Sequence, residues 1–268
     1  MLKDITLGQY FPGTSAIHRL DPRVKIIITF VYIVLLFLAK GAAGYAIMLA
    51  VLCAVTAISG IKIRVVLRSM KPLLFIIAFT AILNMFYTPG TELVRFWIFR
   101  ITREGIETAI YMALRISMLV AGTFVLLTYT TSPIMLTDGI ESLLRPLQKL
   151  RLPVHELAMM MTIALRFVPT LIEETDKIIS AQKARGADFE SGNFLQRARA
   201  LVPILVPLFV SAFRRADELA VAMECRCYRG GEHRTRLKEL RMTGLDYSAL
   251  ALTALVTALI ILTRTFPL

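Results

Sequence analysis

The sequence has 268 residues, 56% of them hydrophobic, a mean hydropathy of +0.66 and a formal net charge of +12. Soluble domains contain roughly 45–50% apolar residues, so the composition excludes an ordinary soluble domain and indicates a membrane protein. The three cysteines, Cys53, Cys225 and Cys227, provide no disulfide framework and fit a reducing, cytoplasmic surrounding.

Five apolar runs approach the length of a membrane span, four of them before residue 132. They cover about residues 24–39, 42–59, 72–87, 105–130 and 245–262. The first three are short for a span, so we expect tilt, local thinning of the bilayer around them, or burial against neighbouring helices. Between the third and fourth runs, aromatic residues around Arg95 predict an anchor at the membrane interface.

Lys and Arg are concentrated on alternate sides of these runs. The N-terminal part up to Lys25 carries four, the loop at 60–71 carries four, and the segment 132–244 carries 17 against 13 acidic residues. By the positive-inside rule these parts face the cytoplasm. The sequence thus predicts an all-α integral membrane protein in three parts: an N-terminal transmembrane region (1–131), a cytoplasmic coupling domain of amphipathic helices (132–244) and a C-terminal transmembrane helix (245–268).

Start and stop signals divide the coupling domain into three helices. Their predicted ranges are 132–145, 154–185 and 194–228. Ser132 followed by Pro133 is typical of a helix start, and Gly186 of a helix end. Apolar stripes flanked by charge favour helices in or near the membrane plane, and the run 200–213, with its two prolines, resembles a buried or re-entrant piece.

The second and third of these helices end alike. Asp176 precedes Arg185 by nine residues, and Asp217 precedes Arg226 by nine. Nine steps of about 100° put each aspartate on the opposite face from its arginine, so neither pair is an internal salt bridge. Small residues flank both arginines: Ala184, Gly186, Cys225 and Cys227.

Two interpretations of these arginine ends are open. A cation is favoured at any helix C-terminus, by about 0.3–1 kcal/mol. Alternatively, small neighbours allow a helix tip to enter a groove on another protein, where the guanidinium donates a rigid fork of hydrogen bonds. The repetition of the pattern in two long helices favours the second.

The sequence resembles the transmembrane T component of energy-coupling factor transporters, ABC-type importers of vitamins and other micronutrients. The resemblance covers nearly the whole chain. It rests on residues of the N-terminal part (Gly8 to Tyr10, Pro12-Gly13, Ser15, His18 to Arg23 and Lys25), on Ile101 to Gly105 with Arg115, on Arg166 to Pro169, and on Ala184-Arg185-Gly186 and Cys225-Arg226-Cys227-Tyr228. It implies that the two arginine motifs dock into grooves on two cytoplasmic ATPase subunits, of the EcfA and EcfA′ type. The second motif keeps the arginine and replaces both of its neighbours.

The resemblance also implies a division of labour. A separate S component in the bacterial cell membrane captures the substrate, and the ATPase subunits bind ATP and magnesium, so this chain carries no cofactor. The absence of a G-x-x-x-x-G-K-[ST] loop agrees with this. The transported substrate is not encoded in this chain, nor is the number of S components that it serves.

Arg115 lies within the fourth apolar run. A charged residue within a membrane span is costly, so it is taken by default to have a function, here a structural or coupling role. The alternative is that its side chain snorkels to the interface or pairs with carbonyls of a neighbouring helix. A membrane-embedded enzyme would need a convergent polar set, and the runs offer little beyond Arg115 and Asn84. We assign no catalytic and no metal-binding residue. A nucleic-acid binder is disfavoured by the near balance of charge in 132–244.

Overall fold

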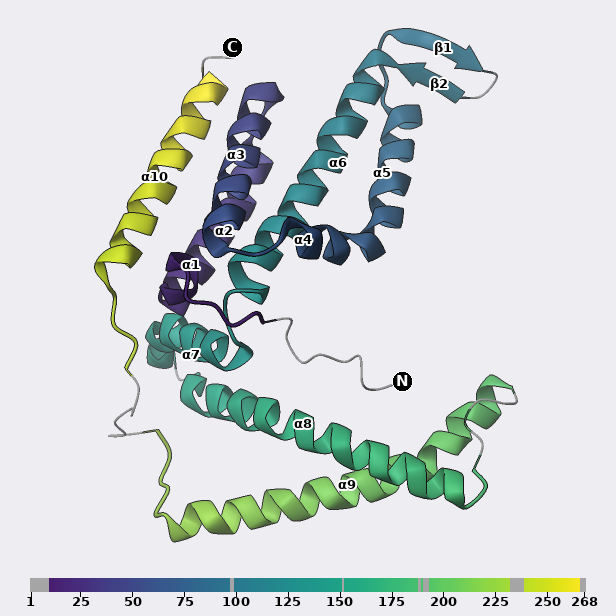
Figure 1. Ribbon diagram of the computed structural model, residues 1–268, viewed down its shortest axis with the longest axis vertical. Helices are drawn as coiled ribbons and strands as arrows, with labels where there is room; N and C mark the ends of the chain where they lie inside the picture. Colours follow the sequence, from purple (N-terminus) through teal and green to yellow (C-terminus); the bar gives the residue numbers. More distant parts are fainter. Residues whose placement is uncertain are drawn as a thin grey trace. The chain divides into compact units, whose positions relative to one another are not determined.

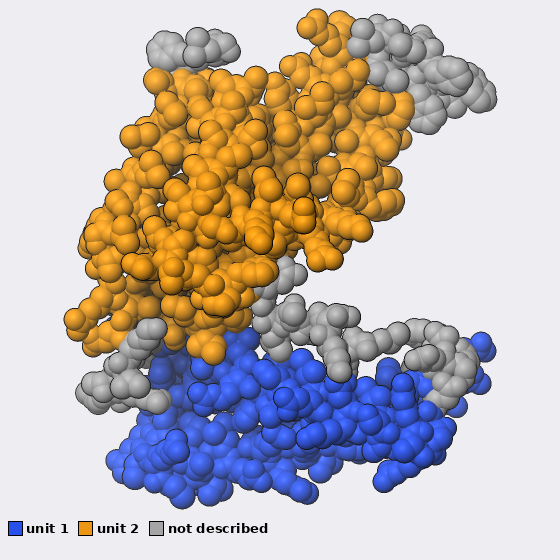
Figure 2. Space-filling view, viewed as in Figure 1, with its two compact units in different colours: residues 1–7, 141–238 blue, residues 8–140, 239–268 orange. Residues whose placement is uncertain are grey.

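The computed structural model describes residues 10–96, 99–150, 152–187, 189, 193–231 and 239–265. Within these ranges the regular secondary structure is helical except for one short hairpin (Figure 1). Contacts divide the chain into two compact units, which are described separately (Figure 2). Unit 1 contains the described residues of 141–238, and unit 2 contains those of 8–140 and 239–268. The three parts predicted from the sequence divide the chain by expected location relative to the membrane. Contacts do not test that division, so it stays a prediction.

Unit 2 contains most of the helices. They are α1 (Ala16–Arg19), α2 (Pro22–Leu38), α3 (Gly41–Ser59), α4 (Ile63–Met70), α5 (Leu74–Tyr87), α6 (Arg103–Thr123), all but the last turn of α7 (Pro133–Leu144), and α10 (Gly244–Thr265). A 3-10 turn at Lys71–Leu73 joins α4 to α5, and a π-helical turn at Phe124–Thr128 extends α6. Local signals account for the ends: Asp21 caps α2 through the Arg23 N–H, and Gly60 adopts φ +70 after α3.

Among the residues that the structure describes, five helical segments are long and apolar enough to cross a membrane. They are Gly41–Ser59, Ile63–Tyr87, Arg103–Thr128, Val154–Ala184 and Gly244–Arg264. The all-α integral membrane class is therefore confirmed, but the set differs from the predicted one. Helix α2 has only 17 residues, about 26 Å at 1.5 Å per residue, whereas the segment 154–184, expected near the membrane plane, has the length and composition of a span.

The connection between α5 and α6 is an antiparallel hairpin of β1 (Glu92–Phe96) and β2 (Phe99–Thr102). Val94 pairs with Ile101, and Phe96 pairs with Phe99. The sequence predicts an aromatic interfacial anchor here and gives no signal of strands. Trp97 and Ile98, which belong to the expected anchor, lie outside the described residues.

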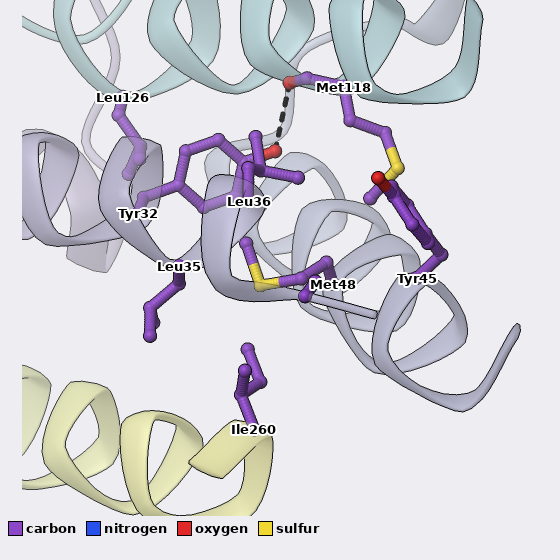
Figure 3. Packing of buried hydrophobic residues seen from close by; sticks show 9 residues of the cluster. Tyr32, Leu35, Leu36, Tyr45, Met48, Met118, Leu126 and Ile260 are labelled. Carbon is purple, nitrogen blue, oxygen red and sulfur yellow. Dashed lines mark hydrogen bonds between the residues drawn. The ribbon is translucent and has the colours of Figure 1, made fainter. Parts of the chain in front are cut away.

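The largest hydrophobic cluster of unit 2 joins α2, α3, α6 and α10 (Figure 3). Tyr32 of α2 donates a hydrogen bond of 2.8 Å to the Met118 carbonyl of α6. A side chain at Gly122 would collide with the Tyr32 ring, so glycine there permits the close approach of the two helices. Ile260 of α10, 1% exposed, completes the cluster.

Unit 1 is built on two long helices, α8 (Val154–Ala184) and α9 (Phe194–Cys225), which follow a 3-10 segment at Arg145–Leu150. Helix α8 agrees with the predicted range. Helix α9 ends at Cys225, three residues before the predicted end at Tyr228, because Cys227 adopts a left-handed conformation and turns the chain. Helix α9 is continuous through 200–213, and most of the large apolar residues there are exposed, so a piece buried within the chain is not observed.

Candidate functional site

Arg185 lies at the end of α8 in a tightly closed turn. Its N–H donates to the carbonyls of Ala181 (3.2 Å) and Gln182 (3.1 Å). Gly186 has φ +85 and donates to Lys183, and the Ala187 N–H reaches back to Gln182 at 3.0 Å. These last two bonds form a Schellman motif, in which a left-handed residue closes the helix and satisfies its final carbonyls.

Arg226 lies at the end of α9 in the same motif. The Cys227 N–H donates to Glu224 (2.8 Å), and the Tyr228 N–H reaches back to Met223 (3.1 Å). Cys227 has φ +56 and is the one non-glycine residue with positive φ in the described part of the chain. The two ends therefore share one backbone geometry, although glycine supplies the left-handed residue in one and cysteine in the other.

All six predicted docking residues are exposed in the structure: Ala184, Arg185, Gly186, Cys225, Arg226 and Cys227. Neither guanidinium forms an ion pair or a side-chain hydrogen bond with a residue that the structure describes. Each motif thus presents an arginine at a helix tip with small residues on both sides. Such a tip fits a groove on a partner, with all the guanidinium donors available.

The two helices pair in an antiparallel manner. Glu174 of α8 accepts a hydrogen bond from Ser211 and one from the Arg215 guanidinium, the latter 2.7 Å long. Further along, Gln182 Nε2 donates to the Pro203 carbonyl at 3.2 Å. The C-terminal ends of α8 and α9 consequently lie at opposite ends of the pair (Figure 1). The two arginine tips therefore lie apart, one at each end of the helix pair.

One face of α9 is apolar and open. Its residues recur at helical spacing and are at least half exposed: Val202, Leu205, Val206, Phe209, Val210 and Phe213. An apolar stripe of this length on a long helix is a surface for lipid or for another protein. The predicted amphipathic character of this helix therefore has a structural counterpart.

Arg115 on α6 is engaged with the neighbouring helices α2 and α3. Its Nε donates to the Tyr45 hydroxyl at 2.8 Å. Its guanidinium carbon lies 5.6 Å from the ring centre of Phe37 and 5.8 Å from that of Tyr45. Aromatic faces stabilise a cation away from water. Aromatic rings and a hydroxyl therefore hold this charge, rather than the helix carbonyls that were one prediction from the sequence.

Unit 2 contains a buried polar cluster that was not predicted from the sequence. Lys25, 1% exposed, donates to Thr130 O (2.8 Å), Thr131 Oγ1 (3.2 Å) and His18 O (3.3 Å). The cluster links the start of α2 to the chain after α6. Lys25 stands one residue inside an apolar run, and that position is the sequence signal that could have indicated a buried charge.

Asp246 belongs to the same cluster and is fully buried. One carboxylate oxygen accepts from the Asp21 N–H (2.7 Å), and the other accepts from the N–H (2.7 Å) and hydroxyl (2.8 Å) of Thr243. Arg23 adds a bond to the Leu240 carbonyl. These contacts fasten the start of α10 to the start of α2.

Among the described residues, no group of His, Cys, Asp or Glu is arranged to hold a metal ion. Apolar helices long enough to span a bilayer define a multi-pass membrane protein, and unit 1 adds a pair of long helices with exposed arginine ends. Residues 13–237 match the CbiQ family, which is described as cobalt transport protein.

Curated relatives agree over nearly the whole chain. Energy-coupling factor transporter transmembrane proteins EcfT are 56% identical in Thermosediminibacter oceani, over 98% of this chain and 99% of the relative, and 53% identical in Ruminiclostridium cellulolyticum, over 98% of both. The relative in Bacillus subtilis is 46% identical over 98% of this chain and all of its own length. The chain belongs to this family of transmembrane components of energy-coupling factor transporters, which confirms the resemblance and makes it a transporter component.

Proposed function

We propose that this chain is the coupling scaffold of an energy-coupling factor importer of a vitamin or another micronutrient. Arg185 and Arg226 dock on two cytoplasmic ABC-type ATPase subunits. These subunits bind and hydrolyse ATP with magnesium, and the scaffold passes their motion to a membrane S component that captures the substrate. In this arrangement the N-terminus and the segment 132–244 lie on the cytoplasmic side, as the distribution of Lys and Arg predicts, and α8 lies near the membrane plane although it has the length and composition of a span.

One observation carries the proposal: two helix tips share the same closed turn, the same exposed arginine and small neighbours, and they lie at opposite ends of one helix pair. A cation that only interacts favourably with the dipole of its own helix does not require the same turn, exposure and small neighbours at both helix ends. Two equivalent tips fit two equivalent grooves, as two ATPase subunits provide. Burial of each guanidinium in a groove makes its truncation cost about 2–5 kcal/mol of docking free energy.

Charge reversal tests the proposal. Arg185→Glu/Arg226→Glu is expected to lose the ATPase subunits during co-purification and to abolish ATP-dependent uptake by the assembled complex. Lys183→Glu/Arg229→Glu is the matched control, because it makes the same change of charge at two exposed residues beside the tips. Retention of the ATPases and normal uptake by the tip variant would refute the proposed docking.

A further inference from the structure

The proposed function requires two tips held at a fixed separation, and the contacts between α8 and α9 supply this. Glu174 has both carboxylate oxygens occupied, Oε1 by the Ser211 hydroxyl and Oε2 by Arg215. Its side chain is 23% exposed and that of Arg215 is 34% exposed. A half-buried carboxylate with two donors from the facing helix has a more definite geometry than an exposed ion pair.

A second contact follows from a proline. In a regular helix the N–H of residue 207 would donate to the carbonyl of residue 203, but Pro207 has no N–H. The freed Pro203 carbonyl accepts the Gln182 side-chain amide of α8 instead. Because the backbone carbonyl of Gln182 also accepts the Arg185 and Ala187 N–H groups, one residue both closes the arginine tip and contacts α9.

The two contacts define the crossing of the helices. They are eight residues apart in each helix, from Glu174 to Gln182 and from Ser211 back to Pro203. One contact leaves a pivot, whereas two contacts about 12 Å apart along antiparallel helices fix the angle between them.

The Glu174–Arg215 pair also occupies equivalent places in the two helices. Arg185 follows Glu174 by 11 residues, and Arg226 follows Arg215 by 11 residues. At 1.5 Å per residue each tip therefore lies about 16 Å along its helix from the pair. The same spacing of 41 residues separates Glu174 from Arg215 and Arg185 from Arg226. The pair is the midpoint between the tips.

We propose that Glu174 and Gln182 are positioning residues that clamp α8 to α9 and set the separation of the two arginine tips. This inference rests on the proposed function. A clamped pair engages two partner sites in one event, so the second contact forms at high effective concentration. Loosening the clamp removes that advantage and weakens retention of the ATPase pair by about tenfold to a hundredfold, while each tip keeps its own affinity.

The test measures the tip separation directly in the full-length chain. Spin labels are attached at Ala181→Cys and Ala222→Cys, exposed residues that are also 41 apart, after the three native cysteines are replaced. Double electron–electron resonance is expected to give one narrow distribution of the distance between the two labels in the parent chain. Glu174→Gln/Gln182→Ala is expected to broaden it, and Glu174→Arg/Arg215→Glu to restore it relative to Glu174→Arg alone.

Matched controls and a second readout complete the test. Glu173→Gln/Lys183→Ala alters exposed neighbours on α8 and is expected to leave the distribution narrow. In the assembled complex, the clamp variant is expected to hydrolyse ATP while importing less substrate per ATP. If Glu174→Gln/Gln182→Ala folds poorly, Gln182→Ala alone serves, because it removes one of the two contacts and leaves the ion pair in place.

The outcomes separate the two proposals. An unchanged distance distribution in the clamp variants, with docking lost in Arg185→Glu/Arg226→Glu, overturns the positioning role and leaves the docking role intact. A broadened distribution with ATPase retention unaffected by both sets of variants overturns the docking role instead.

Discussion

Unit 2 buries charged side chains among its helices, whereas unit 1 joins two long helices through half-buried and exposed polar contacts. Lys25 and Asp246 are withdrawn from solvent and fully hydrogen-bonded, while the buried hydrophobic residues in the described part of unit 1 are only Val154, Ala158 and Ile204. Unit 2 therefore carries its own core. Unit 1 exposes the apolar face of α9 and depends on lipid or partners to cover it.

The contrast predicts that removal of one carboxylate has very different effects in the two units. Asp246→Ala leaves the N–H groups of Asp21 and Thr243 unpaired in a buried place, so the free energy of unfolding is expected to fall by about 3–5 kcal/mol. Asp217→Ala, at an exposed position of α9, is the control and is expected to change little. Thermal unfolding of the two purified variants in the same detergent measures the difference. Equal midpoints of thermal unfolding for the two variants would contradict the proposed difference between buried charges in unit 2 and exposed ones in unit 1.

Arg115 is a second charged residue of unit 2, held by aromatic rings and a hydroxyl, and its removal is expected to have a smaller effect. Arg115→Met loses the bond to Tyr45 and the two ring contacts, so the free energy of unfolding is expected to fall by about 1–2 kcal/mol. If the arginine has a structural role, uptake per folded complex stays at the parental level. A loss of uptake without a change in thermal stability would show that it acts in coupling instead.

The smallest expected effect concerns the turn after Arg226. Cys227 occupies a left-handed conformation that disfavours any side chain by about 1–2 kcal/mol, so Cys227→Gly is expected to stabilise the end of α9 by about 1 kcal/mol. Gly186→Ala, at the equivalent place after Arg185, is expected to have the opposite sign. Hydrogen exchange of the Ala187 and Tyr228 amides reports on both turns. Effects of the same sign would contradict the shared geometry.

Helix positions could be predicted because their signals are local. Pro133 after Ser132 marks the start of α7, and Gly186 marks the end of α8. The end of α9 was missed because cysteine rarely takes the left-handed conformation that Cys227 adopts. Helix α4 lies in a stretch interpreted as a loop, since its alternation of charged and apolar residues gives no continuous apolar run.

The contacts of the site were harder to predict because they join distant residues. Asp21 and Asp246 are 225 residues apart, and Glu174 and Arg215 are 41 apart. No local periodicity encodes such pairs. Asp176 and Asp217, at matching places before the two arginine ends, are however also 41 residues apart. The same step from Glu174 leads to Arg215.

Cross-linking from the tips tests the central claim most directly. A photoreactive residue at Ala184 and, separately, at Cys225 is predicted to cross-link to an ATPase subunit in the assembled transporter, because each position is exposed beside its arginine. The same residue at Tyr87, 81% exposed on α5, is predicted to give no ATPase product. ATPase products from both tips would support two-point docking, and their absence from both, with the complex intact, would contradict it.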